Sequence, residues 1–293
     1  MKPSARPRRP VRPRNAIIGV AGIATLVLVL FVAAVGPLLT STGPFALSAD
    51  PLQPPSASHP FGTDNLGRDV LTGILYGART SLLVAFGATA VAFVVGCVVG
   101  AVAGYRGGLV DDLLMRLCDI FQAVPRLVLT LVIVALFGSD LVNLLLVLGL
   151  LSWPEVARIL RGQFISLRER DYVAAVHSIG MKDTRIIFRE ILPNALPPTL
   201  VTTSLLLSSC IILEAGLAYL GLSDPNYISW GRMLNIAQPF LSQAPWLVVF
   251  PSIAIFVTSL GAALSADYLN DRLNPRRLRK RSRWSFARPA RTD

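Results

Sequence analysis

Six long apolar runs, separated by polar or charged segments, dominate the pattern of the chain. An apolar helix of about 20 residues crosses the roughly 30 Å hydrocarbon core of a bilayer. We interpret as membrane spans the runs Ile17–Leu39, Ser81–Gly104, Leu117–Phe137, Leu141–Leu160, Leu196–Leu222 and Trp246–Leu269. The sequence therefore predicts an all-α membrane protein with six transmembrane helices.

The first run has a competing interpretation as a secretory signal peptide. A signal peptide has a shorter apolar core, followed by a small-residue cleavage site. Neither feature is clear here. We therefore expect residues 16–39 to be an uncleaved first span, preceded by a basic tail of residues 1–15.

The remaining segments divide by polarity. Residues 40–79 are rich in proline and serine and predict an extracytoplasmic loop that ends in a short helix. Residues 80–269 form the membrane core, which includes a charged turn at 105–116. A second basic tail follows at 270–293. Within the core we expect kinks at Pro125 and Pro154 and close helix packing at Gly96 and Gly100.

Basic residues indicate the orientation. Six spans place both termini on one side, and 24 of the 28 lysines and arginines fall on that side. By the positive-inside rule this side is the cytoplasm. Residues 168–193, which carry several of these charges, are therefore expected to be cytoplasmic.

Composition agrees with a membrane protein and excludes several functions. The chain is 53% hydrophobic with a net charge of +11 and a mean hydropathy of +0.58. Because the charge lies between and outside the apolar runs, lipid and topology explain it, and we expect no nucleic-acid partner. There is no phosphate-binding loop, no catalytic constellation and no metal-ligand spacing around His59 or His177. We therefore expect no enzyme activity and no metal site, and any nucleotide site would lie on another chain.

The segment 168–193 is the longest charged interruption and carries its own helical pattern. Tyr172, Ala175, Val176 and Ile179 recur at helical spacing, and Gly180 is suited to end that helix in a left-handed conformation. A second short helix is predicted over Lys182–Ile191, closed by Pro193. Two such helices indicate either a docking surface for a protein or a surface helix on the lipid headgroups.

Ionisable residues lie inside several of the predicted spans. Arg126 and Glu155 are about equally far from the turn near residue 140, so we predict that they pair; a substrate contact is the alternative. Glu214 follows Ser204, Ser208 and Ser209 in span five, a stripe that either lines a path or forms interhelical hydrogen bonds. Asp119 is expected to meet one of two arginines on span four, Arg158 or Arg161.

The segment 172–193 resembles the EAA loop of ABC importer permeases, which couples the permease to its ATPase. That motif reads E-A-A, three residues, Gly, nine residues, Ile-x-Leu-Pro, and Gly180 and Leu192-Pro193 stand at the matching separation. The E-A-A positions hold Ala174, Ala175 and Val176, so the glutamate is missing, and Glu190 occupies the first Ile position. The resemblance implies an ATPase-docking set made of Tyr172, Ala174, Ala175, Val176, Ile179, Gly180, Leu192 and Pro193.

Further motifs narrow the resemblance to the C-type permeases of dipeptide and oligopeptide importers. They are H-P-F-G-T-D-N-L-G-R-D-V-L (59–71), Y-G-A-R-T-S-L-L-V (76–84), S-W-G-R-M-L (229–234), A-P-W (244–246) and L-N-D-R-L-N-P-R (269–276). The resemblance covers roughly residues 59–278 and leaves out both tails.

This resemblance implies a type I ABC importer permease fold in a bacterial inner or plasma membrane. The implied partners are a homologous B-type permease, two ATPase subunits that hold ATP and Mg²⁺, and an extracytoplasmic peptide-binding protein. The chain itself would bind no cofactor. A permease for nickel, glutathione or another small solute is the alternative within the family. A proton-coupled transporter is disfavoured, because no internal repeat is visible and only Glu214 is an intramembrane acid without a basic neighbour.

Overall fold

The computed structural model describes residues 13–40 and 42–273, and within them the chain is built from helices. The predicted basic tails, 1–15 and 270–293, lie mostly outside these residues. The helices are α1 (Pro13–Leu39), α2 (Val70–Arg106), α3 (Gly108–Ala123), α4 (Arg126–Phe137), α5 (Leu141–Leu150), α6 (Trp153–Arg168), α7 (Asp171–Ser178), α8 (Asp183–Ile186), the π-helix η1 (Ile187–Ile191), α9 (Leu192–Tyr219), α10 (Trp230–Ala237), the 3₁₀-helix η2 (Gln238–Phe240) and α11 (Trp246–Leu273).

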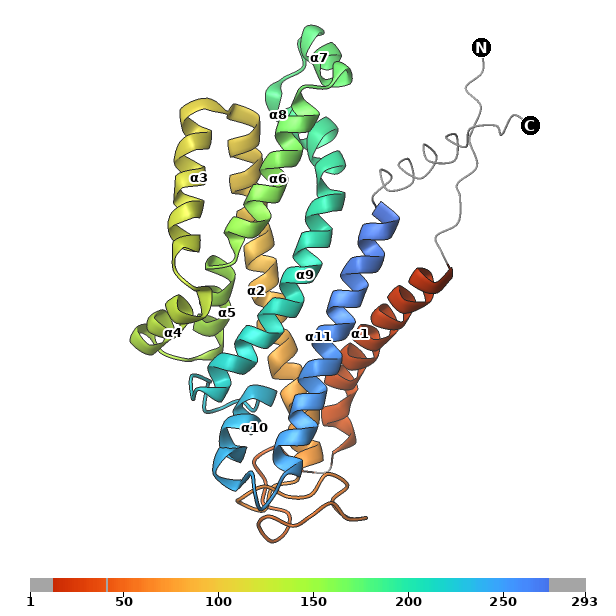
Figure 1. The fold of residues 1–293 in the computed structure, drawn as a ribbon, viewed down its shortest axis with the longest axis vertical. Helices are drawn as coiled ribbons and strands as arrows, with labels where there is room; N and C mark the ends of the chain where they lie inside the picture. Colours follow the sequence, from red (N-terminus) through yellow and green to blue (C-terminus); the bar gives the residue numbers. More distant parts are fainter. Residues whose placement is uncertain (1–12, 41, 274–293) are drawn as a thin grey trace, which may run out of the picture.

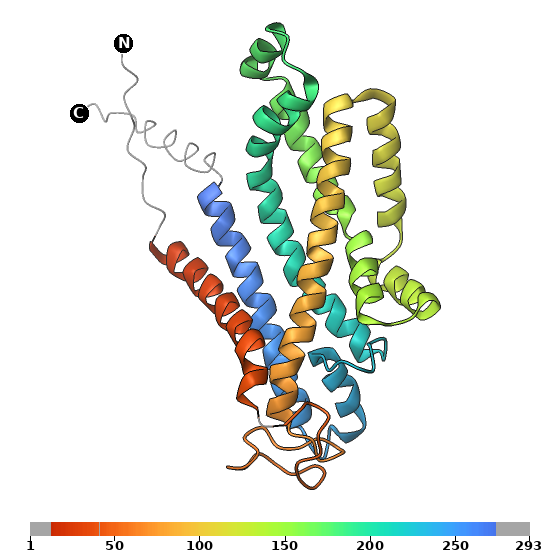
Figure 2. The same ribbon diagram turned by 180° about the vertical axis from the view of Figure 1, so that it is seen from behind.

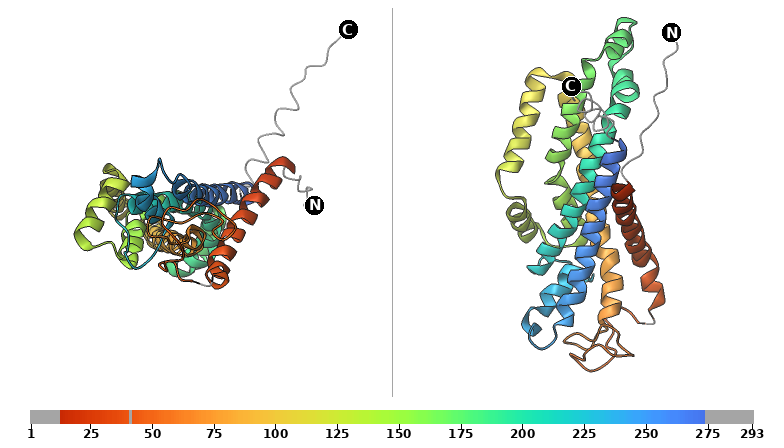
Figure 3. Two further views of the ribbon diagram at one scale, coloured as in Figure 1. Left: turned by 90° about the horizontal axis from the view of Figure 1, so that it is seen from below. Right: turned by 45° about the vertical axis from the view of Figure 1, so that its right-hand side comes forward.

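The helices form an elongated bundle around α2 (Figure 1). Viewed from behind, α2 runs most of the length of the molecule, with α7 and α8 at one end and the loop that precedes α2 at the other (Figure 2). The core joins α2, α5 and α9 through Ala85, Leu148 and Ile211, which are fully buried. Seen from below, α1 lies at one side of the bundle and α4 at the opposite side (Figure 3).

Five continuous spans match the length and apolarity that a bilayer requires. They are Ile17–Leu39, Val70–Arg106, Leu141–Arg168, Asp183–Tyr219 and Trp246–Arg272. A sixth exists only if α3 and α4, which meet at 83°, are counted as one broken span. The beginning of α1 and the end of α11 point toward the α7 end of the molecule, as six crossings require (Figure 1).

The prediction of one kinked helix over 117–137 is wrong. The chain breaks completely at Val124, which is extended at φ −102° and ψ 136° because a residue before proline avoids the helical region. The prediction of a charged turn over 105–116 is also wrong. This stretch is mostly helical, since α3 begins at Gly108 directly after α2. The expected break near Pro154 does occur, between α5 and α6, with Pro154 in the first turn of α6.

The short helix expected at the end of the first loop is not a separate element. It is the beginning of α2, which runs for 37 residues from Val70 to Arg106. No proline interrupts this stretch, and Asp69 caps its start by accepting a hydrogen bond from the Thr72 amide at 2.8 Å.

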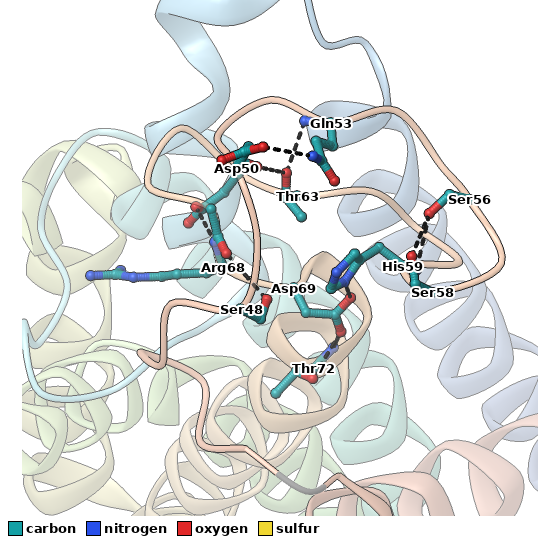
Figure 4. Close-up of polar contacts among 12 residues, drawn as sticks. Ser48, Asp50, Gln53, Ser56, Ser58, His59, Thr63, Arg68, Asp69 and Thr72 are labelled. Carbon is teal, nitrogen blue, oxygen red and sulfur yellow. Dashed lines mark hydrogen bonds and ion pairs between the residues drawn. The ribbon is translucent and has the colours of Figure 1, made fainter.

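The loop ahead of α2, which the sequence predicts to be extracytoplasmic, is folded rather than extended. Figure 4 shows Thr63 bonded to both sides of a turn: its hydroxyl donates to the Asp50 carbonyl and accepts from the Gln53 amide, both at 2.8 Å. His59 Nδ1 lies 3.1 Å from Asp69 Oδ1, so the residue that caps α2 also holds the loop. The loop is thereby fastened to the first turn of a membrane span.

Two arginine side chains that stack on one aromatic ring join the same loop to α10. The Phe45 ring has the Arg68 guanidinium 5.3 Å from its centroid and the Arg232 guanidinium 5.6 Å from it. Burial and the nearby Arg68 charge lower the pKa of Arg232 from its ordinary value. Arg232 Nη1 donates to the carbonyl of Pro225 at 2.6 Å and to that of Tyr227 at 2.8 Å. This end of the molecule is therefore one packed layer.

Replacement of Asp69 by alanine is expected to loosen this layer locally. The change removes the α2 cap and the His59 contact, and a lost N-cap costs about 1 kcal/mol. Amide hydrogen exchange should accelerate over roughly residues 48–75 and stay unchanged in α9. Asp69→Asn keeps an N-cap acceptor and should exchange nearly as slowly as the parent; equal acceleration in both variants would contradict the capping role.

Candidate functional site: the cytoplasmic segment and the intramembrane charges

Segment 168–193 forms two short helices joined at a glycine, as the sequence predicts. Gly180 has φ +78°, the left-handed region that favours glycine. The Gly180 amide donates to the His177 carbonyl and the Met181 amide to the Val176 carbonyl, which together make a Schellman motif at the end of α7. The elbow between α7 and α8 is thus fixed by backbone geometry.

The face predicted from helical spacing divides into an inner and an outer half. Val173 is buried against Phe164 of α6 and Ile186 of α8, and Val176 packs partly against the same cluster. Tyr172, Ala175 and Ile179 point outward, and Ile179 is 78% exposed. Sequence reasoning missed Val173, although its three-residue spacing to Val176 carries the signal.

The outer surface of the segment carries a second large apolar side chain besides Ile179, set among exposed charged residues. Phe188 of η1 is 64% exposed, and Ala174 and Pro193 are also exposed, while Leu192 is partly buried. Large exposed apolar side chains at one end of a membrane protein are typical of a contact surface. We refer to Tyr172, Ala174, Ala175, Ile179, Gly180 and Phe188 as the docking face.

The prediction that Pro193 closes the second helix is wrong. α8, η1 and α9 follow one another without a break. Together they form one helical stretch, Asp183–Tyr219, of 37 residues that is long and apolar enough to cross a membrane. The π-helix η1 accommodates the proline, because the Leu192 amide bonds to the Ile187 carbonyl five residues back and so shifts the register. The docking face therefore continues directly into a membrane span.

Polar contacts also attach the segment to α2 and α6. The Tyr105 hydroxyl donates to Asp183 Oδ1 at 2.7 Å, and Arg168 Nη1 donates to the Tyr105 carbonyl at 2.7 Å. An open cavity of about 610 Å³ lies beside these contacts, lined in part by Ala174, His177 and Asp183. The end of α2 is thus tied both to α8 and to the end of α6.

Three ion pairs connect α6 to α3 and α4. Glu155, Arg158 and Arg161 follow at three-residue spacing, which places them along one side of α6. The predicted Arg126–Glu155 pair is confirmed, with Nη1 3.4 Å from Oε1. Arg158 contacts Asp119, also as predicted.

The third pair was not predicted. Arg161 binds Asp111 of α3 through two nitrogens, with Nη2 2.5 Å from Oδ2. Sequence reasoning missed this pair, because Asp111 lay in a stretch interpreted as a turn, whereas α3 in fact runs beside α6.

Glu214 lies inside the subunit. Its side chain is 1% exposed, and its Oε2 has no hydrogen-bond partner among the described residues. It lines a small cavity with Thr80 of α2 and Ser229 at the start of α10. Of the serines that precede it, Ser208 donates to the Ser259 carbonyl of α11 at 2.9 Å, which is an interhelical bond.

Among residues 13–40 and 42–273, no group of three histidine, cysteine, aspartate or glutamate side chains is arranged to hold a metal ion. The three cysteines are free thiols, and Cys118 and Cys210 are buried.

Comparison with known proteins gives a consistent result. Residues 96–279 match the family described as binding-protein-dependent transport system inner membrane component. The dipeptide transport system permease protein DppC of Alkalihalophilus pseudofirmus is 40% identical over 89% of this chain and 86% of its own. The glutathione transport system permease protein GsiD of Pectobacterium atrosepticum is 38% identical over 76% of this chain and 74% of its own.

A solved structure supports the architecture. A chain from the inward-facing MetNI methionine ABC transporter superposes with a TM-score of 0.53 at 17% identity, covering 67% of this chain and 96% of that one. At this level of identity the similarity bears on the fold alone.

Proposed function

The chain belongs to the family of binding-protein-dependent transport system inner membrane components, and from that membership we propose that it forms half of the pore of an importer for short peptides. It is a multi-pass permease subunit with the ABC transporter permease fold. The substrate class rests on the relatives, since a dipeptide and glutathione, itself a tripeptide, are both short peptides. Nickel or another small solute is the alternative substrate.

The docking face is the proposed contact for an ATPase subunit that supplies ATP and Mg²⁺. Exposed Ile179 and Phe188 offer apolar anchors, and helix-in-groove docking uses such anchors on a short helix. Leu192 and Pro193 are the first two residues of α9, and they connect the docking face to that helix. Ala174, where the family motif has glutamate, leaves the contact without an acidic group at that position.

Coupling then proceeds through rigid elements. A movement of the docking face acts on α2 through the Tyr105–Asp183 bond and on α6 through the Val173–Phe164 packing. Such a movement switches the pore only if nucleotide binding favours one of two bundle states by a few kcal/mol. A homologous second permease would supply the other half of the pore, and an extracytoplasmic binding protein would deliver the peptide.

Uptake of a labelled dipeptide tests this function directly. The chain is reconstituted in vesicles with the second permease, the ATPase subunits and the binding protein encoded beside it. We expect uptake that requires both ATP and the binding protein. ATP-driven uptake of Ni²⁺ in place of peptides, or ATP-independent uptake driven by a proton gradient, would overturn the proposal.

A further inference from the structure

The Arg126–Glu155 pair differs from the two other ion pairs on α6. Its atoms are 3.4 Å apart, whereas Arg161 and Asp111 form two short bonds. Arg126 Nη1 also donates to Ser152 Oγ at 3.1 Å, so this nitrogen is divided between two acceptors. The pair at the break between α3 and α4 is therefore the loosest of the three and the easiest to open.

The depth and exposure of the Arg126–Glu155 pair are a second notable feature. Glu155 lies halfway along the span Leu141–Arg168, yet its side chain is 48% exposed on the subunit, and that of Arg126 is 24% exposed. A charge that faces lipid at such depth is costly, and intramembrane charges face a bundle interior or a water-filled cavity. The side of the subunit that carries these two groups is consequently the side that faces the transport path or the second permease.

We infer that Arg126 and Glu155 form a transit subsite for the two charged ends of a short peptide, an inference that rests on the proposed function. The planar Arg126 guanidinium suits the C-terminal carboxylate, which it binds through two parallel hydrogen bonds. The Glu155 carboxylate suits the N-terminal ammonium. Without peptide, the two side chains neutralise each other, so neither charge is left alone in the membrane.

The dimensions set the movement that binding requires. An extended dipeptide spans about 7 Å between its charged ends, and the pair is closed at 3.4 Å. With a hydrogen bond of about 2.8 Å at each end, a peptide held between the two groups places them about 12–13 Å apart, so the two side chains must separate by about 9 Å. Arg126 stands at the first residue of α4 and Glu155 in the first turn of α6, so a change of the angle between α4 and α6 opens the pair.

Cysteine labelling in the complete importer tests the subsite. Ile159→Cys, at an exposed position one turn from Glu155 on α6, and Val128→Cys, at an exposed apolar position of α4, are compared in a chain whose three native cysteines are replaced by alanine. Both variants keep Arg126 and Glu155. We expect the thiol at position 159 to react with a charged, membrane-impermeant thiosulfonate, and dipeptide under turnover conditions to slow that reaction by about tenfold or more. The thiol at position 128 should show no protection. Absence of labelling at 159, or labelling that peptide does not change, would overturn the subsite.

Transport by variants that remove one charge gives a second readout. Glu155→Gln and Arg126→Gln each remove the charged contact to one end of the peptide, for which we expect uptake to fall about tenfold or more at normal assembly. The matched control is Asp119→Asn on the neighbouring ion pair, which should keep most of the uptake. Equal losses in all three variants would assign the pairs a purely structural role and overturn the subsite.

The two proposals fail in different ways. If the unmodified importer takes up dipeptide but dipeptide does not change the labelling at 159, the subsite is wrong and the function stands. If the unmodified importer takes up no peptide, the proposed function fails before the subsite is reached.

Discussion

Replacement of Ile179 by aspartate is expected to abolish ATP-driven uptake while the chain still inserts into the membrane. Ile179 is 78% exposed, so the substitution removes no internal packing and the new carboxylate is solvated in the isolated subunit. Once the docking face is covered by the ATPase, the same carboxylate is buried without a partner. A buried charge without its partner costs about 3–5 kcal/mol, which weakens association by about 10²–10³-fold.

Co-purification of the ATPase with the permease, measured beside uptake, checks this result. The matched control is Leu109→Asp, since Leu109 is 80% exposed at the beginning of α3 and lies outside the docking face. We expect the Leu109 variant to retain its ATPase and the Ile179 variant to lose it. Normal co-purification and uptake with Ile179→Asp would show that the partner docks elsewhere.

The features of this site that sequence reasoning predicted are those fixed by local geometry. Gly180 is left-handed because a helix end there requires it, and glycine adopts that conformation without a steric penalty. The Arg126–Glu155 contact followed from counting residues on both sides of one turn, which is valid because α4 and α5 form a short antiparallel pair. Neither prediction needed knowledge of distant elements.

The features it missed depend on packing between elements. An apolar run over 117–137 has the composition of a single span, and a proline inside such a run either bends a helix or ends it. The outcome at Pro125 is a full break, which periodicity does not reveal. The same limit explains the Asp111–Arg161 pair, because Asp111 reaches α6 only when residues 108–123 fold as a helix beside it.

Pro193 shows a third kind of limit. A proline after a short amphipathic helix normally signals its end, yet here η1 shifts the hydrogen-bond register and the helix axis continues into α9. This continuity matters for function, since it makes the docking face an extension of a membrane span. The family resemblance carried no information about this connection.

Alanine at Gly100 is expected to destabilise the subunit, whereas alanine at Gly162 is expected to be neutral or stabilising. A Cβ at Gly100 would lie 2.5 Å from the Ala157 carbonyl oxygen and 3.0 Å from the Leu160 Cβ, so α2 and α6 would have to move apart. Forcing an extra methyl group into a packed interface costs about 1–3 kcal/mol. At Gly162, also within a helix, a Cβ meets nothing within 4 Å, and replacing glycine by alanine there removes a helix penalty of about 0.5–1 kcal/mol.

Thermal unfolding of the two purified variants in detergent measures this contrast. We expect about 1–3 kcal/mol, because both glycines lie within helices and the helix gain is common to both. The consequence extends to transport, because Gly100 lies on the same contact between α2 and α6 that ends at Tyr105 and Arg168. Separating these helices should weaken the connection from the docking face to the spans, so Gly100→Ala should lower uptake more than it lowers the amount of assembled importer. Similar stability of the two variants would contradict the close approach of α2 and α6, while a loss of uptake strictly proportional to lost assembly would separate that contact from the coupling route.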